Sequence, residues 1–110
     1  MLKELMYTSC AVKGFTEADL TNVLQVSEVY NAERFITGVL LYDGTAFMQI
    51  LEGEEADVQE LFERIKRDPR HSNVKLESFV AIKKRTFPNW SLKSIKVSIA
   101  ISNPCPNPDT

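Results

Sequence analysis

Residues 36–53 read ITGVLLYDGTAFMQILEG. The runs Ile36–Tyr42 and Ala46–Leu51 are rich in β-branched, aliphatic and aromatic residues, as is typical of strands. Asp43-Gly44, which separates them, is a strong turn signal because both residue types tolerate positive φ. The segment therefore predicts two antiparallel strands joined as a hairpin.

A helix is expected on each side of this hairpin. The first begins at Thr16, which with Asp19 forms a capping box, and runs to about Asn31 on an apolar stripe at helical spacing. The second follows Gly53 with an acidic first turn and ends at Pro69. Its buried face is predicted from the apolar spacing of Val58, Leu61, Phe62 and Ile65.

Outer strands are expected at Leu2–Ser9, Val74–Lys84 and Leu92–Ala100. The resulting order βαββαββ is that of an α+β, ferredoxin-like (split βαβ) sandwich, with one mixed sheet and both helices on one face. We expect one domain over residues 1–100. Residues 101–110 are proline-rich and predict a disordered tail or the start of a linker.

The composition excludes several classes of function. Thirteen Lys and Arg against 15 Asp and Glu are interspersed, so neither a nucleic-acid-binding surface nor a nucleic-acid partner is expected. No apolar run is long enough for a membrane span. Cys10 and Cys105 lie far apart without metal-ligand spacing, and we expect both to be free thiols in a reducing cytoplasm.

Gln49 is a polar residue inside the apolar run Phe47–Leu51. An unpaired buried amide costs about 1–3 kcal/mol, so Gln49 needs a partner. Tyr7 lies on the first expected strand, which neighbours the third in this layout, so its hydroxyl can approach the Gln49 amide. A purely structural Tyr–Gln hydrogen bond is the alternative, and the pattern alone favours it.

Other polar residues are less informative. Arg64 and Asp68 stand four positions apart on the second helix, where the simplest interpretation is an exposed ion pair. Asp68 in the last turn opposes the helix dipole, which leaves a role toward a ligand open. For His71 the sequence indicates no Ser or Cys partner, and a lone His is more often structural; Trp90 is more typical of core packing. No motif for a metal site, a phosphate loop or a dinucleotide appears.

Several blocks in order carry a resemblance to a known family: Tyr7-Thr8-Ser9, Asn31-Ala32, ITGVLLYDG (36–44), FMQILEG (47–53), RIKRDPRH (64–71) and FPNWS (87–91). Together they resemble the BLUF family, sensors of blue light using flavin adenine dinucleotide, from Leu2 to about Val97. The resemblance implies a photoreceptor rather than an enzyme. Its cofactor would be FAD, with FMN or riboflavin as alternatives, held between the two helices.

The resemblance also implies roles for single residues. Asn31 would hydrogen-bond the carbonyl and N3 edge of the flavin, and Arg64 with Asp68 would hold its pyrimidine side. The residues expected to contact the flavin are Tyr7, Asn31, Ile36, Gln49, Arg64, Ile65, Asp68 and His71.

The photochemical switch is expected at two residues. By resemblance, Tyr7 donates an electron and a proton after light absorption, and Gln49 rotates or tautomerises and strengthens its hydrogen bond to flavin O4. The signal would pass through Ser9, Trp90, Ser91 and Leu92. Three positions depart from many relatives: Leu92 replaces a frequent Met, Tyr30 a frequent Asn, and Phe35 a frequent Gly.

The partners expected beside the flavin are a second copy of the chain, in a homo-oligomer, and an unidentified effector protein or fused output domain. Two alternatives stay open. One is a ferredoxin-like interaction module that has lost its cofactor. The other is a sensor fragment of a light-regulated nucleotide cyclase or cyclic-dinucleotide phosphodiesterase.

Overall fold

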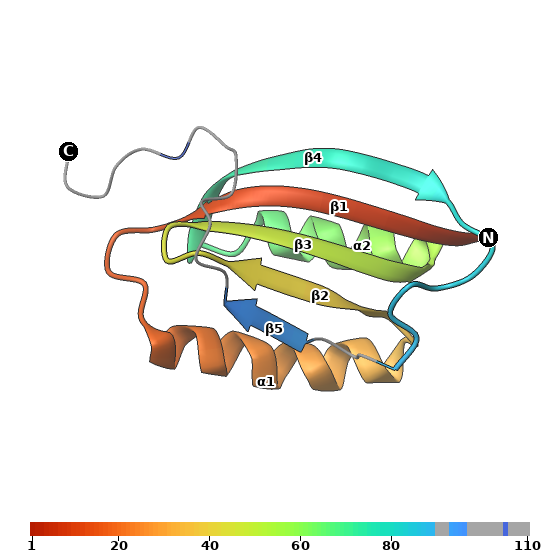
Figure 1. Cartoon of the computed structure of the whole chain (residues 1–110), viewed down its shortest axis with the longest axis horizontal. Helices are drawn as coiled ribbons and strands as arrows, with labels where there is room; N and C mark the ends of the chain where they lie inside the picture. Colours follow the sequence, from red (N-terminus) through yellow and green to blue (C-terminus); the bar gives the residue numbers. More distant parts are fainter. Residues whose placement is uncertain (90–92, 97–104, 106–110) are drawn as a thin grey trace.

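The structure is a computed structural model, and it describes residues 1–89, 93–96 and 105 of the 110 residues. The element order βαββαββ is confirmed (Figure 1). The elements are β1 Leu2–Ala11, α1 Glu17–Glu33, β2 Thr37–Tyr42, β3 Ala46–Glu54, α2 Glu55–Lys66, β4 His71–Ala81 and β5 Lys93–Lys96.

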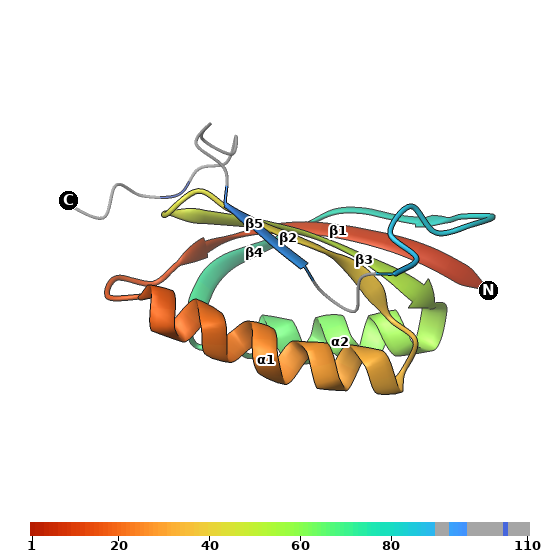
Figure 2. The same ribbon diagram turned by 60° about the horizontal axis from the view of Figure 1, so that its bottom comes forward.

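The strands form one sheet in the order β4-β1-β3-β2-β5. All neighbouring pairs are antiparallel except β2 with β5, which is parallel, so the sheet is mixed as predicted. Both helices pack on the same face of the sheet (Figure 2). This arrangement confirms the ferredoxin-like α+β fold and places β1 and β3 side by side.

The central hairpin forms as expected. Asp43 Oδ1 accepts hydrogen bonds from the backbone N–H groups of Thr45 and Ala46, at 2.8 and 2.7 Å. Gly44 has φ 98°, a conformation that glycine adopts without strain. The turn sets the register in which Tyr42 pairs with Phe47 and Leu40 with Gln49.

Both predicted helices are present. Thr16 and Asp19 make the capping box that starts α1, and α1 continues two residues beyond Asn31. The buried face of α2 contains Val58, Leu61 and Phe62, as its apolar spacing predicts.

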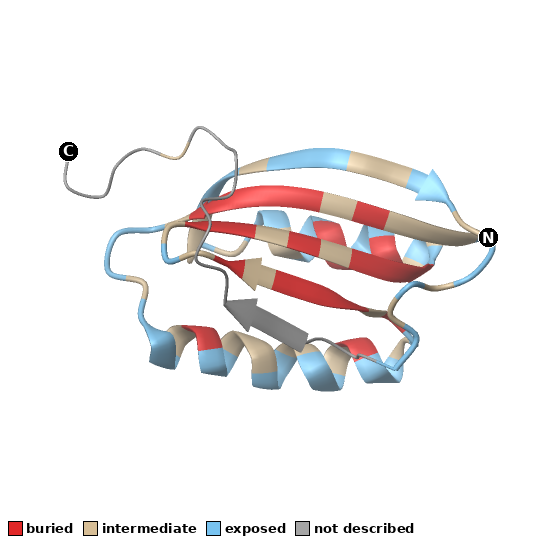
Figure 3. Cartoon of the chain, in the orientation of Figure 1, coloured by how far each residue is buried: buried red, intermediate tan, exposed pale blue. Residues whose placement is uncertain are grey.

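The buried residues lie mainly on β1, β2 and β3 and on the helix faces toward them (Figure 3). One hydrophobic cluster lies under α2 and is made by Leu5, Tyr7, Ile36, Leu51, Val58, Leu61 and Phe62. A second lies toward α1 and is made by Leu20, Leu40, Tyr42 and Phe47. The clusters leave the polar residues of β1 and β3 between the two helices.

The outer strands differ from the prediction in their bounds. β4 begins at His71 rather than Val74, because His71 and Ser72 pair with the end of β1 at Ala11 and Cys10. Residues 97–100 of the expected last strand lie outside the described residues, as does the predicted tail apart from Cys105.

The prediction of two free thiols is wrong. Cys10, at the end of β1, and Cys105 form a disulfide with their Cα atoms 5.5 Å apart. The separation of 95 residues along the chain gave no sign of this pairing, because only the folded path of the chain brings the two residues together.

No helix in the described part of the chain is long and apolar enough to cross a bilayer.

Candidate functional site

A pocket lies between α1, α2 and the sheet face that the helices cover. Its walls are largely apolar and include Phe15, Val23, Leu40, Phe47, Leu61 and Ile65. Polar side chains enter it from the two central strands, from the end of α1 and from the segment after α2: Tyr7, Gln49, Asn31, Asp68, Arg70 and His71. Apolar walls with a few convergent polar groups are typical of a small-molecule site.

Tyr7 and Gln49 meet on the floor of this pocket. Their Cα atoms are direct partners between β1 and β3, and their residues are 4% and 5% exposed. The Tyr7 hydroxyl donates a hydrogen bond to Gln49 Oε1, as the neighbouring strands predict. The Gln49 amide nitrogen has no hydrogen-bond partner among the described residues. It is therefore available as a donor to a ligand in the pocket.

The pKa of Tyr7 is raised well above its ordinary value. Burial is the main cause, and the negative charge of Asp68 adds to it. The phenol therefore keeps its proton throughout the physiological pH range, and Tyr7 acts as a hydrogen-bond donor in the resting protein.

Asn31 is 1% exposed and lies at the pocket wall near the end of α1. Its backbone carbonyl accepts hydrogen bonds from the N–H groups of Arg34 and Ile36, at 3.1 and 2.9 Å. These bonds fix the turn from α1 into β2. Asn31, which the resemblance assigns to the flavin edge, therefore lies at the wall of the pocket.

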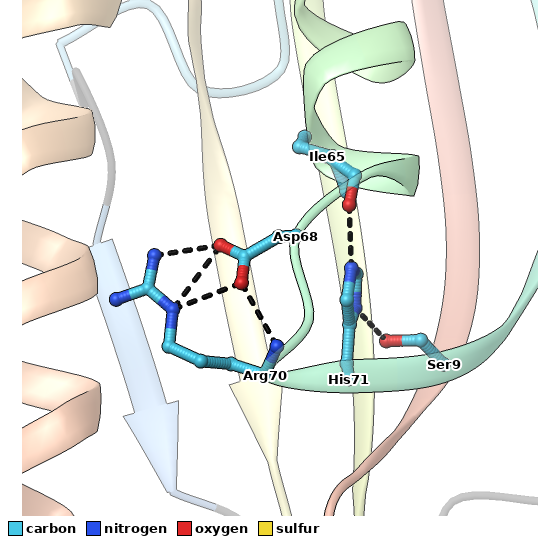
Figure 4. Close-up of polar contacts among 5 residues, drawn as sticks. All are labelled: Ser9, Ile65, Asp68, Arg70 and His71. Atoms are coloured by element: carbon cyan, nitrogen blue, oxygen red, sulfur yellow. Dashed lines mark hydrogen bonds and ion pairs between the residues drawn. The ribbon is translucent and has the colours of Figure 1, made fainter.

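His71 links three elements beside the pocket (Figure 4). Its Nε2 lies 2.6 Å from the Ile65 carbonyl oxygen, and its Nδ1 lies 2.8 Å from Ser9 Oγ. Because a carbonyl oxygen can only accept, Nε2 carries a proton toward Ile65; in the neutral imidazole, Nδ1 accepts from the Ser9 hydroxyl. His71 thereby ties the start of β4 to the end of α2 and to β1.

Asp68 does not pair with Arg64 as the sequence suggested. Because α2 ends at Lys66, Asp68 lies beyond the helix and pairs with Arg70 instead. Arg70 Nη2 lies 2.6 Å from Asp68 Oδ2, Arg70 Nε lies 3.0 Å from Oδ1, and the Arg70 backbone N–H also donates to Oδ1 (Figure 4). The hydrogen bonds from the Arg70 side chain hold the pKa of Asp68 below its ordinary value.

Arg70 is a pocket residue that the sequence analysis missed. A signal was present, because Pro69 between Asp68 and Arg70 favours a turn in which the two side chains can meet. Phe15, Leu40, Phe47 and Leu61 were also not singled out as pocket residues. Their apolar side chains had no feature that distinguished a pocket wall from the core.

Two of the predicted ligand contacts do not line the pocket. Ile36 is fully buried in the cluster under α2. The Arg64 guanidinium stacks on the Tyr30 ring, 4.2 Å from its centroid, and Arg34 contacts the same ring at 3.6 Å. In this structure the Arg64 guanidinium therefore contacts Tyr30 rather than the pocket. The predicted relay residues Trp90, Ser91 and Leu92 lie outside the described residues.

Phe35 also differs from the residue that is frequent in the resembling family. It has φ 54°, in the left-handed region that favours glycine, and it is 77% exposed. The backbone at this turn therefore keeps the conformation expected for glycine although the side chain is large.

The Asp68–Arg70 pair gives a test of its own. Arg70→Gln is expected to lower the free energy of unfolding at pH 7 by less than about 1 kcal/mol, because both side chains are partly exposed. Since the pKa of Asp68 is lowered in the fold, its stabilising effect is present above its ordinary pKa and is lost as the pH falls through the lowered value. Urea unfolding should show a difference between parent and variant at pH 7 that shrinks below about pH 4.

The matched control is Arg67→Gln, because the exposed Arg67 guanidinium donates to the Glu63 carbonyl. Its effect should not change over the same pH range. If the effect of Arg70→Gln were equally independent of pH, the ion pair would not be what stabilises this segment.

The donor set suits a flat heteroaromatic ring with carbonyl and N–H groups on one edge. The amides of Asn31 and Gln49 offer both donors and acceptors, and apolar side chains from both helices can pack on the ring faces. A flavin ring has this chemistry, so the residues present fit it. Among the described residues, no group of His, Cys, Asp and Glu could hold a metal ion.

Comparison with known proteins leads to a family that uses a flavin. The family model described as "Sensors of blue-light using FAD" matches residues 2–93. The photoactivated adenylate cyclase subunit beta of Euglena gracilis is 35% identical over 94 residues, which are 84% of this chain and 11% of that protein. The blue light- and temperature-regulated antirepressor BluF of Escherichia coli is 32% identical over 74 residues, which are 67% of this chain and 18% of the relative.

Solved structures agree with this result. The dark-state structure of the BLUF protein BlrB has a TM-score of 0.84 and 36% identity, over 86% of this chain and 72% of that one. A bacterial light-regulated adenylyl cyclase has a TM-score of 0.85 and 38% identity, over 87% of this chain and 28% of that one. The chain thus spans only a small part of the cyclases that it matches.

Proposed function

Because the chain belongs to the BLUF family of blue-light sensors, we propose that its pocket binds FAD non-covalently and that Tyr7 and Gln49 form the light-driven switch. The observation that carries this proposal is the buried hydrogen bond from Tyr7 to Gln49 at the pocket floor. A structural Tyr–Gln pair does not need a pocket above it, whereas a switch does.

The family description supports FAD as the ligand. FMN and riboflavin are alternatives, and a structure of the related Klebsiella pneumoniae BlrP1 contains FMN. Asn31 and Asp68 would bind the polar edge of the ring, and Ile65 would pack against it. His71 would act near that edge and would also hold Ser9.

A bound flavin would supply absorption of blue light and an excited-state electron acceptor. Tyr7 would give the electron, and because an oxidised phenol is strongly acidic, its proton would move along the existing hydrogen bond to Gln49 Oε1. Gln49 would then rotate or tautomerise, and the electron and proton would return to Tyr7. The rearranged amide would donate a stronger hydrogen bond to flavin O4, and the flavin would end chemically unchanged.

The first experiment is an absorption spectrum of the purified protein in the dark and directly after blue light. The expected result is a flavin spectrum that shifts slightly to the red and returns in darkness. Bound flavin without a reversible shift would contradict the switch. Protein that stays colourless after refolding with excess FAD would support the cofactor-less interaction module.

We further propose that the domain itself is a sensor without enzymatic activity, since its relatives include both cyclases and an antirepressor. Its output would be a fused domain or an effector protein. The cyclase names favour a nucleotide cyclase as the fused domain, and determining the coding sequence around this chain tests that. The homo-oligomer, the cytoplasmic location and the division at residue 100 stay predictions.

A further inference from the structure

Glu52 is the only buried carboxylate among the described residues, and it is fully buried. It lies on β3 three positions after Gln49, so the two side chains point to opposite faces of the sheet. Neither the pocket nor the Tyr7–Gln49 switch uses Glu52. A buried ionised carboxylate is costly unless hydrogen-bond donors compensate it, so these donors identify what Glu52 does.

The donors come from the segment that connects β4 to β5. Glu52 Oε2 accepts from the backbone N–H of Thr86 at 2.9 Å, and Oε1 accepts from that of Phe87 at 2.8 Å. Arg85 Nη1 donates to the Glu52 backbone oxygen at 2.7 Å and to Thr37 Oγ1 at 2.9 Å. Consecutive residues of one segment therefore bind both the side chain and the backbone of Glu52.

Glu4, on the neighbouring strand β1, is affected by the charge of Glu52. It is the direct partner of Glu52 between β1 and β3. The pKa of Glu4 is raised, first by burial and then by its hydrogen bond with Glu52 and the charge of Glu52. The two carboxyl groups therefore lie side by side at the start of β1 and the end of β3, and Glu52 accepts from both backbone N–H groups of the segment after β4.

The position of this contact in the fold connects two functional parts. Gln49 and Glu52 lie on one strand, roughly 10 Å apart at about 3.3 Å per residue. The segment held by Glu52 passes the ends of β1 and β3 on its way to β5, which adds to β2 at the edge of the sheet (Figure 1). Any movement of β3 that follows rearrangement of Gln49 is thereby applied to the amides of residues 86 and 87.

We propose that Glu52 is a positioning residue that couples β3 to the segment leading into β5, so that rearrangement of Gln49 changes the position of this segment. The proposal rests on the proposed light-sensing function, because Gln49 has to move first. A carboxylate suits the role because both oxygens accept. In a glutamine the amide nitrogen would face one of the two N–H donors.

The test uses Glu52→Gln in the flavin-loaded protein, with amide hydrogen exchange in the dark and under blue light as the readout. We expect flavin binding and the red shift to be retained. In the dark, the amide of Thr86 or Phe87 should exchange about tenfold faster, because a charge-assisted hydrogen bond is lost. The difference between light and dark exchange in residues 93–96 should fall to less than about half of the parent value, since the coupling contact is weakened.

Glu54→Gln is the matched control, because it changes an exposed carboxylate on the same strand. It should leave the exchange of β5 unchanged. Thr86→Pro is the second variant. It removes one N–H donor from an exposed position and leaves Glu52 in place, so it keeps the test valid if Glu52→Gln does not fold.

The outcomes distinguish a failure of the light-sensing function from a failure of the role proposed for Glu52. A parent protein without a reversible red shift contradicts the light-sensing function itself. If the parent shows the shift, the light-induced exchange difference in β5 is compared between parent and variants. An equal difference in the parent and in Glu52→Gln or Thr86→Pro overturns the role of Glu52 alone. A parent whose β5 shows no light-induced difference at all overturns it as well.

Discussion

Gln49→Leu is expected to retain flavin and to lose the reversible red shift completely. Leucine is close to glutamine in size and keeps the pocket floor filled, but it offers neither a donor nor an acceptor. Tyr7 then loses the acceptor of its hydrogen bond, which leaves its buried hydroxyl unsatisfied at a cost of about 1–3 kcal/mol, partly offset by the apolar gain of leucine. Absorption spectra before and after blue light measure the first effect, and urea unfolding measures the second.

Gln59→Leu is the control for this substitution. It makes the same chemical change at an exposed position of α2 and should leave both the spectrum and the shift unaltered. If Gln49→Leu photocycled normally, the switch would have to be assigned to another residue, with Asn31 the first to test because it is the other buried amide at the pocket.

Local rules predict much of the fold because they agree with one another. The Asp43-Gly44 turn fixes the hairpin, and the period-2 alternation of β1 and β3 puts Tyr7 and Gln49 on the same side of neighbouring strands. Both helices lie on one face of the sheet (Figure 2), and Tyr7 and Gln49 line a pocket together with residues of both helices, so this face is theirs. The switch pair could therefore be found from the strand order and the parity of two positions, without any knowledge of side-chain packing.

Contacts that depend on where an element ends could not be predicted in the same way. Asp68 was placed on α2 with Arg64, but α2 ends two residues earlier, so Asp68 turns to Arg70 and Arg64 turns to Tyr30. An error of half a helical turn is enough to exchange ion-pair partners. The Cys10–Cys105 disulfide and the contacts of Glu52 with residues 86 and 87 depend on paths of loops, for which the sequence has no periodic signal.

Gly38→Ala is expected to destabilise the sheet by about 3 kcal/mol and to weaken flavin retention with it. A Cβ atom at Gly38 would lie 1.9 Å from the backbone oxygen of Ile50 on β3, so β2 and β3 would have to separate. Because Leu40 on β2 is the direct partner of Gln49 and both line the pocket, this separation would distort the switch as well as the core. The midpoint of urea unfolding and the absorbance of bound flavin after dialysis measure the two effects.

Gly53→Ala separates this close approach from the general cost of replacing a glycine in a strand. A Cβ atom there would lie 3.3 Å from side-chain carbons of Ile36 and Val58, which can shift by a few tenths of an ångström, whereas a backbone oxygen within a β-ladder cannot move without breaking the ladder. The loss for Gly53→Ala should therefore be clearly smaller than that for Gly38→Ala. Equal losses would show that the tight contact between β2 and β3 is not what requires glycine at position 38.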